Sequence, residues 1–186
     1  MDPFLILGLP ERLAVDTGQL EEHFRRLGKE AHPDRGGSAA DFERLRSAYE
    51  VVKSPAKRIR AMVGEAESRG SVPGEVMDLF GSVAEAMEAV EQFLKERAVA
   101  RSGLGRAVLD AKIPALRKSL EDLIEKLGAL ESGLIDWFPF FDEKGWDACE
   151  AEMGEVARGL VFLEKWQAQI REATGKLFEA LLGGMS

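Results

Sequence analysis

His32 and Asp34 flank Pro33 in the stretch KEAHPDRGG, and of all the residues in the chain this pair is best suited to chemistry. An imidazole moves protons near neutral pH, and a carboxylate two residues away could be its acid or base partner. One hypothesis is therefore an enzyme that uses these two groups. Both lie in one loop, however, without a nucleophile, a metal cluster or a glycine-rich phosphate loop beside them. The residues thus predict a protein that is not an enzyme.

The tripeptide lies between two predicted amphipathic helices. Asp16 and Gln19 form a capping pattern at the start of the first helix, and Pro33 disfavours helical backbone at His32, so this helix should end near Ala31. The second helix opens at Ser38, with an acid three residues later. The apolar stripes at helical spacing are Leu20, Phe24, Leu27 and Ala31, and then Phe42, Leu45, Ala48, Tyr49 and Val52.

By itself, the tripeptide could be no more than a helix end. Proline commonly follows a helix, aspartate forms turns, and histidine complements a helix C-terminus. The basic residues around it favour a recognition surface. Arg25 and Lys29 lie four apart, on a face away from the apolar stripe, with Arg26 between them, and Arg35 follows directly.

The remaining pattern predicts an all-α protein in two parts. The first part, residues 1–64, is an antiparallel helical hairpin with two short flanking helices, near 3–7 and 55–63. Residues 65–74 are rich in glycine and serine and form a predicted linker. Residues 75–186 predict an antiparallel three-helix bundle, with long helices over about 76–94, 114–130 and 143–182. Residues 98–112 are ambiguous, and an aromatic turn region holds Trp137, Phe138, Phe140 and Phe141.

Composition limits the possible partners. The 186 residues carry a net charge of −8 and a pI near 5.0, which argues against nucleic acid. The charge is uneven, with a net of +1 over residues 1–64 and −9 over 65–186. A single cysteine, Cys149, permits no internal disulfide and is expected to be a buried thiol. With no apolar run long enough to span a bilayer, we expect a cytoplasmic protein without membrane contact and without a cofactor or metal site.

Two parts of the sequence carry a family resemblance. The stretches DPFLILGLP, DTGQLEEHFRRLGKEAHPDRGG and FERLRSAYEVVKSPAKRIRAMV, within residues 2–63, resemble the HscB family, the J-domain co-chaperones of iron–sulfur cluster assembly. GWDACEAEMGEVARGLVFLEKWQAQI is similar to the final helix of that family. Ala31 stands where the family commonly has tyrosine. The resemblance implies a J domain over 1–64 and a client-binding bundle over 75–186.

The resemblance also implies a chaperone-binding site. In such a protein, His32, Pro33 and Asp34 contact a DnaK/HscA-type ATPase chaperone and stimulate its ATP hydrolysis, with Asp34 paired to an arginine of the partner. The basic residues Arg25, Arg26, Lys29 and Arg35 would meet an acidic surface of that chaperone.

A client-binding site is implied on the bundle. The client would be an iron–sulfur scaffold protein (IscU-like), and the implied contacts are Val76, Met77, Phe80, Glu88 and Phe162. Two alternatives stay open. A Met/Phe stripe on a bundle helix can simply be core. The chain can also be a J-domain adaptor for a different client, because Gly81 and Ala84 stand where the family commonly has glutamates.

Overall fold

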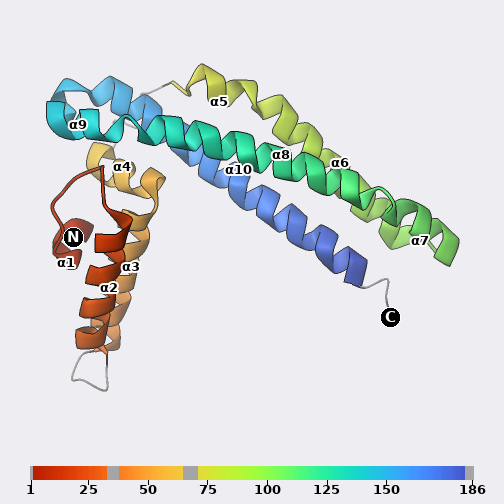
Figure 1. Ribbon diagram of the computed structural model, residues 1–186, viewed down its shortest axis with the longest axis horizontal. Coiled ribbons are helices and arrows are strands. Elements are labelled where there is room, and N and C mark those ends of the chain that lie inside the picture. The colour runs from red at the N-terminus through yellow and green to blue at the C-terminus, as the bar shows by residue number, and fades with distance from the viewer. Residues whose placement is uncertain (1, 33–37, 65–70, 183–186) are drawn as a thin grey trace. The chain divides into compact units, whose positions relative to one another are not determined.

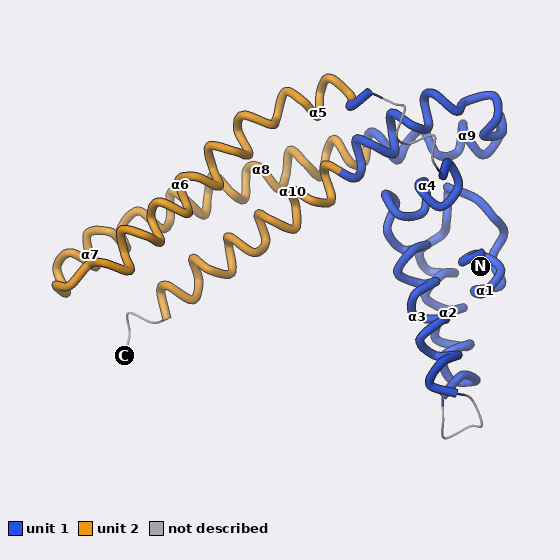
Figure 2. The backbone as a smooth tube through the Cα atoms, turned by 180° about the vertical axis from the view of Figure 1, so that it is seen from behind, with its two compact units in different colours: residues 1–72, 133–161 blue, residues 73–132, 162–186 orange. Residues whose placement is uncertain are grey.

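The computed structural model describes residues 2–32, 38–64 and 71–182, and over these ranges it is all-α, as predicted (Figure 1). Two compact units divide the chain and are described separately: unit 1 comprises Met1–Val72 and Gly133–Val161, and unit 2 comprises Pro73–Ser132 and Phe162–Ser186 (Figure 2). The helices in chain order are α1 (Pro3–Leu7), α2 (Thr17–Ala31), α3 (Ala39–Lys53), α4 (Pro55–Val63), α5 (Gly74–Asp78), α6 (Phe80–Val99), α7 (Gly103–Asp110), α8 (Ile113–Ile135), α9 (Phe138–Lys144) and α10 (Glu150–Leu182).

Helices α1, α2 and α3 of unit 1 enclose a first core, and α2 and α3 form the predicted antiparallel hairpin. Local signals fix the helix starts. Asp16 accepts the backbone N–H of Gln19 at 3.0 Å, and Ser38 accepts that of Asp41 at 3.0 Å. The stacked rings of Phe24 and Tyr49, with centroids 4.1 Å apart, help to hold the two helices together. The buried residues of this core are Phe4, Leu7, Leu20, Leu45, Ala48 and Val52.

A second core in unit 1 joins distant parts of the sequence. It brings Leu13 and α4 together with α9 and the start of α10, and it includes the buried thiol of Cys149, as expected. Asp142 accepts the backbone N–H groups of Leu13 and Ala14, both at 2.8 Å. Arg58, which is 5% exposed, donates to the Val52 carbonyl at 2.8 Å and lies over the ring of Phe138.

The segment before the last helix differs from the prediction. The sequence predicted one helix from about Glu143 to Leu182. This prediction is wrong at its start, because α9 ends at Lys144 and α10 begins only at Glu150. Gly145 separates them with φ +81°, a backbone conformation that ends a helix and favours glycine. The aromatic turn region is also largely helical, since α9 contains Phe138 and Phe141, both buried. The ambiguous segment contains α7.

Unit 2 holds the predicted three-helix bundle. The long helix α6, most of α8 and the second part of α10 lie alongside one another and alternate in direction (Figure 2). A part-buried ion pair between Arg97 and Asp110, with N to O 2.6 Å, fastens the end of α6 to α7. Gln167 of α10 donates to Glu131 of α8 at 2.7 Å. In these three long helices, the buried side chains are Val83, Ala86, Val90 and Phe93 of α6, Ile113, Leu120, Leu123 and Leu127 of α8, and Leu163, Trp166, Ile170, Ala173 and Leu177 of α10.

The division of the sequence into 1–64, 65–74 and 75–186 stays a prediction. Most of the expected linker, residues 65–70, lies outside the described ranges. By packing, residues 133–161 group with the first 72 residues rather than with the bundle. Of the helices described, none combines the length and the apolar character needed to cross a membrane.

Candidate functional site

The first candidate site is the C-terminal end of α2. His32 follows the last helical residue with φ −67° and ψ 136°, and its side chain is exposed. This extended backbone is what a following proline requires, so the tripeptide ends the helix as the sequence predicted. Pro33, Asp34 and Arg35 lie outside the described residues.

The basic residues of α2 lie on the surface. Arg25, Arg26 and Lys29 are all exposed, on the side of α2 opposite the Phe24 ring that packs on α3. Arg26 forms an ion pair with Glu30, with N to O 3.7 Å. An exposed pair at this distance contributes little to stability, so both side chains remain available to a partner. The structure thus brings His32 and three of the four predicted basic residues to one helix end.

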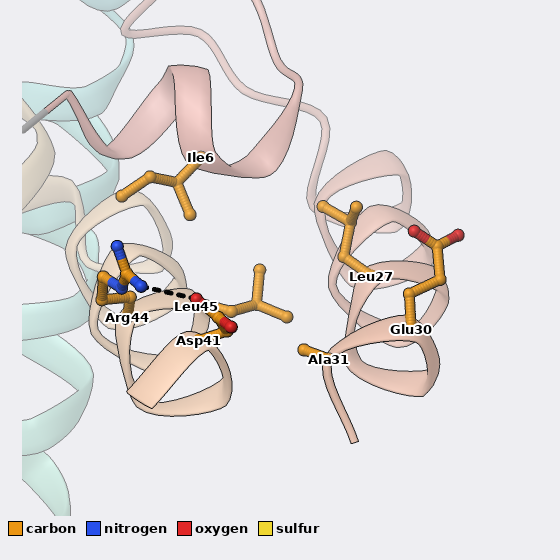
Figure 3. A pocket seen from close by; sticks show the side chains of 7 residues that line it. All are labelled: Ile6, Leu27, Glu30, Ala31, Asp41, Arg44 and Leu45. Atoms are coloured by element: carbon orange, nitrogen blue, oxygen red, sulfur yellow. Dashed lines mark hydrogen bonds and ion pairs between the residues drawn. The ribbon is translucent and has the colours of Figure 1, made fainter. Parts of the chain in front are cut away.

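A pocket of about 280 Å³ lies beside this helix end, between α1, α2 and α3 (Figure 3). Sequence reasoning missed it, although the small residue Ala31 forms part of its wall. Arg44 and Asp41 form an ion pair at its polar edge, with N to O 2.5 Å. The hydrogen bond from the Ser38 hydroxyl lowers the pKa of Asp41, and the positive charge of Arg44 lowers it further. The lining residues are Ile6, Leu27, Glu30, Ala31, Asp41, Arg44 and Leu45.

The second candidate site is an apolar surface in unit 2. Met77 and Phe80 are 48% and 54% exposed, so they present apolar area to solvent rather than filling the core. Val76 differs, because it is only 1% exposed and packs beneath the surface. Glu88 is also exposed, and it lies about two turns after Phe80 on α6.

Two helices meet at this surface through Trp166. The ring of Phe80 from α6 lies edge-on to Trp166, with centroids 6.2 Å apart. Phe162, one turn before Trp166 on α10 and half-buried, lies 5.6 Å from the same ring. Trp166 itself is buried, and sequence analysis did not identify it as a site residue, although its i, i+4 spacing from Phe162 was the available signal. Hereafter Met77, Phe80 and Phe162 are called the apolar patch.

The chemistry available at the apolar patch is recognition rather than catalysis. Two aromatic side chains around a buried tryptophan, and an exposed methionine on the preceding helix, suit binding to an apolar segment of another protein. In the ranges that the structure describes, no group of three or more His, Cys, Asp or Glu side chains is arranged to hold a metal ion.

Comparison with known proteins extends the resemblance to the whole chain. No protein-family model matches it. A curated protein of Cupriavidus taiwanensis is 29% identical over 193 residues, with 95% of both chains covered. One of Ralstonia nicotianae is 27% identical over 190 residues, with 94% of both covered. Both are described as "Co-chaperone protein HscB homolog".

The chain is thus similar to HscB co-chaperone homologues along nearly its whole length. The similarity to these HscB homologues is not confined to the segment around His32. It runs through both compact units and so includes the helices that carry the apolar patch.

Proposed function

We propose that this chain is a cytoplasmic J-domain co-chaperone, and not itself an enzyme. It stimulates ATP hydrolysis by a DnaK/HscA-type chaperone and delivers a client to it, the iron–sulfur cluster scaffold protein. The observation that carries the proposal is the similarity to two HscB homologues over about 95% of the chain. The exposed His32 at the end of α2 supports it, because a contact residue must be accessible.

The chaperone contact consists of a recognition loop and a basic helix face. His32, with Pro33 and Asp34 after it, contacts the ATPase near its interdomain linker, and Asp34 pairs there with an arginine. Arg25, Arg26 and Lys29 face an acidic surface of the partner, with Arg35 in the loop, and they mainly accelerate encounter. Binding favours the hydrolysis-competent state of the chaperone, which is a shift in population between two existing states.

The client contact is the apolar patch. Met77, Phe80 and Phe162 bury apolar area of the scaffold protein, and Glu88 provides a charged contact at the edge. Val76 supports this surface from below instead of touching the client. Because one chain carries both contacts, the client reaches the chaperone at a raised effective concentration.

Single-turnover ATP hydrolysis by the purified chaperone tests the first contact. We expect wild type to accelerate hydrolysis and His32→Gln to lose most of that acceleration. Glu22→Gln, at an exposed position of the same helix, is the matched control and should behave as wild type. No stimulation by wild type would refute the J-domain function, and full stimulation by His32→Gln would refute the role of His32.

A second candidate function is a J-domain adaptor for a different client. Gly81 and Ala84 favour it, since both are exposed on α6 at positions where the resemblance led us to expect glutamates. Calorimetric titration with the scaffold protein separates the two functions. Binding that Phe80→Ala weakens supports the scaffold client, whereas no binding by wild type, together with normal stimulation of the chaperone, supports the adaptor.

A further inference from the structure

Helix α9 presents aromatic rings that neither the chaperone contact nor the client contact uses. Trp137 and Phe140 are 49% and 41% exposed, and their rings meet edge to face with centroids 5.8 Å apart. Beneath them lies Phe141, which is 2% exposed and stacked on Trp137 at 6.1 Å. Hereafter Trp137 and Phe140 are called the outer aromatic pair.

The core does not require this pair. Phe138 and Phe141, three residues apart on α9, already fill the second core of unit 1. The outer aromatic pair instead exposes large apolar area to water, which is unfavourable unless a partner covers it. Trp137 stacks on buried Phe141 and Phe140 meets it edge-on, and these contacts hold both rings in place, so that little side-chain entropy is lost on binding. Rigid exposed aromatic rings are typical of the residues that dominate binding energy in protein interfaces.

The charges around the pair indicate which partner it fits. The exposed acids of residues 136–150 are Asp136, Glu143, Asp147 and Glu150, and the exposed base is Lys144. Arg12 is an exposed base on a neighbouring segment, next to the Leu13 that bonds to Asp142 of α9. Glu143 lies one turn from Phe140 on α9, and Asp136 directly precedes Trp137. The faces of aromatic rings also carry negative charge and attract cations. Carboxylates thus outnumber bases around the pair, which favours a basic partner over anionic lipids and nucleic acids.

The inner side of the same cluster already binds such a group. The guanidinium of Arg58 lies over the ring of Phe138, with Cζ 5.4 Å from the centroid. A planar guanidinium can stack on a ring and donate to a carboxylate at its edge, which an ammonium ion does less well. The outer face likewise presents aromatic rings, it has carboxylates beside them, and both are open to solvent.

We infer that the outer aromatic pair of α9, with Asp136 and Glu143, binds an arginine-bearing apolar segment of a protein partner. The guanidinium stacks on Trp137 or Phe140 and pairs with a carboxylate, while neighbouring apolar side chains cover the rest of the rings. This inference does not depend on the proposed function, since the surface is distinct from α2 and from the apolar patch.

Fluorescence anisotropy with short labelled peptides tests the inference on the full-length chain. The probe alternates leucine and arginine, and the matched peptides replace every arginine by lysine, glutamine or glutamate. We expect the arginine peptide to bind about tenfold more tightly than the glutamine peptide at low ionic strength, and the glutamate peptide to bind most weakly. Trp137→Ala/Phe140→Ala should abolish this preference, and Leu104→Ala/Val108→Ala, which removes two exposed apolar side chains of α7 outside both proposed contacts, should retain it.

A second variant avoids any loss of ring packing. Asp136→Lys/Glu143→Lys changes exposed charges only and should shift the preference towards the glutamate peptide. Equal binding of the arginine and glutamine peptides, or no effect of either variant, would overturn the inference. Sedimentation velocity provides a further test. If the wild-type chain forms a dimer and Trp137→Ala/Phe140→Ala is monomeric, a second copy of the chain covers this surface, and the inference is overturned.

Discussion

Asp142 and Leu13 are joined by a hydrogen bond across 129 positions of the sequence. The Leu13 N–H donates to Oδ1 of Asp142 at 2.8 Å, and the neighbouring Ala14 N–H donates to Oδ2 at the same distance. The leucine side chain is fully buried in the second core. One carboxylate therefore fixes the segment before α2 against α9.

Removal of this carboxylate should destabilise unit 1. We expect Asp142→Ala to lower the free energy of unfolding by about 2 kcal/mol, because the backbone N–H of Leu13 then lacks its partner in a partly buried position. Asp142→Asn keeps one acceptor oxygen and should lose about half as much. Urea denaturation of the full chain measures both. Glu143→Ala, at an exposed neighbouring position, is the control, and an equal effect of Glu143→Ala would contradict the role of Asp142.

Arg58 should matter to stability although it is charged and buried. Arg58→Ala is expected to lower the free energy of unfolding by about 2–4 kcal/mol, because it opens a cavity against Phe138 and leaves the Val52 carbonyl without its donor. Arg58→Met keeps most of the packing and should lose less. The exposed Lys57 on the same helix provides the control, since Lys57→Ala should change stability by less than about 0.5 kcal/mol.

The pH dependence of that variant series has a definite sign. Burial lowers the pKa of Arg58 to about 10, and the charge of Asp142 partly opposes the shift. The native state thus binds this proton more weakly than the unfolded chain does. The stability difference between wild type and Arg58→Met should stay constant below about pH 9 and should move in favour of wild type as the pH rises through about 10. A difference that already changes between pH 6 and 8 would contradict this assignment.

Val76 and Met77 are neighbours with opposite expected effects. Val76→Ala removes buried apolar volume and should lower the free energy of unfolding by about 2 kcal/mol, with scaffold affinity of the folded protein nearly unchanged. Met77→Ala removes an exposed side chain and should leave stability unchanged while it weakens scaffold binding about tenfold. Thermal denaturation and calorimetric titration together distinguish the two. A loss of affinity with Val76→Ala alone would place the client contact elsewhere.

Ser38 should stabilise the start of α3 and keep the pKa of Asp41 low. Its hydroxyl donates to the Asp41 carboxylate at 2.6 Å and accepts the Asp41 N–H at 3.0 Å. Ser38→Ala is expected to lower the free energy of unfolding by about 1 kcal/mol through loss of the cap. It should also raise the pKa of Asp41 towards its ordinary value, which an NMR titration of the side-chain carboxyl measures.

The lowered pKa of Asp41 sets the direction of its pH effect. The stability that this carboxylate contributes is present above the ordinary pKa of an aspartate and is lost as the pH falls through its lower value in the folded protein. The benefit of Ser38 over alanine should therefore shrink under acid conditions. Ser47→Ala, exposed on the same helix, should change neither the stability nor this titration.

Local signals made the first helices predictable from sequence. The caps of α2 and α3 and Pro55 at the start of α4 are each encoded within a few residues. The start of α10 was not predicted, because acids on both sides, Glu143 and Glu150, fit one continuous helix. In the structure, the positive φ of Gly145 and a 3-10 turn over Trp146–Ala148 interrupt it.

The site residues also divide into those whose positions follow from local sequence and those whose positions depend on tertiary packing. The position of His32 at a helix end follows from Pro33 alone. The meeting of Phe80 and Phe162 at Trp166 depends on tertiary packing between helices far apart in the sequence, so spacing could identify each side chain but not their contact. Arginine is usually a surface residue, and the burial of Arg58 follows only from the arrival of Phe138 beside it.

The two cores of unit 1 impose an order on folding during protein synthesis. The first core is complete once residues 4–62 are available, whereas the second requires residues 133–161. At about 5–20 residues per second, the ribosome needs on the order of 3 to 12 s to make the intervening segment 73–132. During that interval, Leu13 and the apolar side of α4 have no covering partner of their own unit. A nascent chain of this protein thus exposes, for several seconds, apolar surface that the finished protein covers.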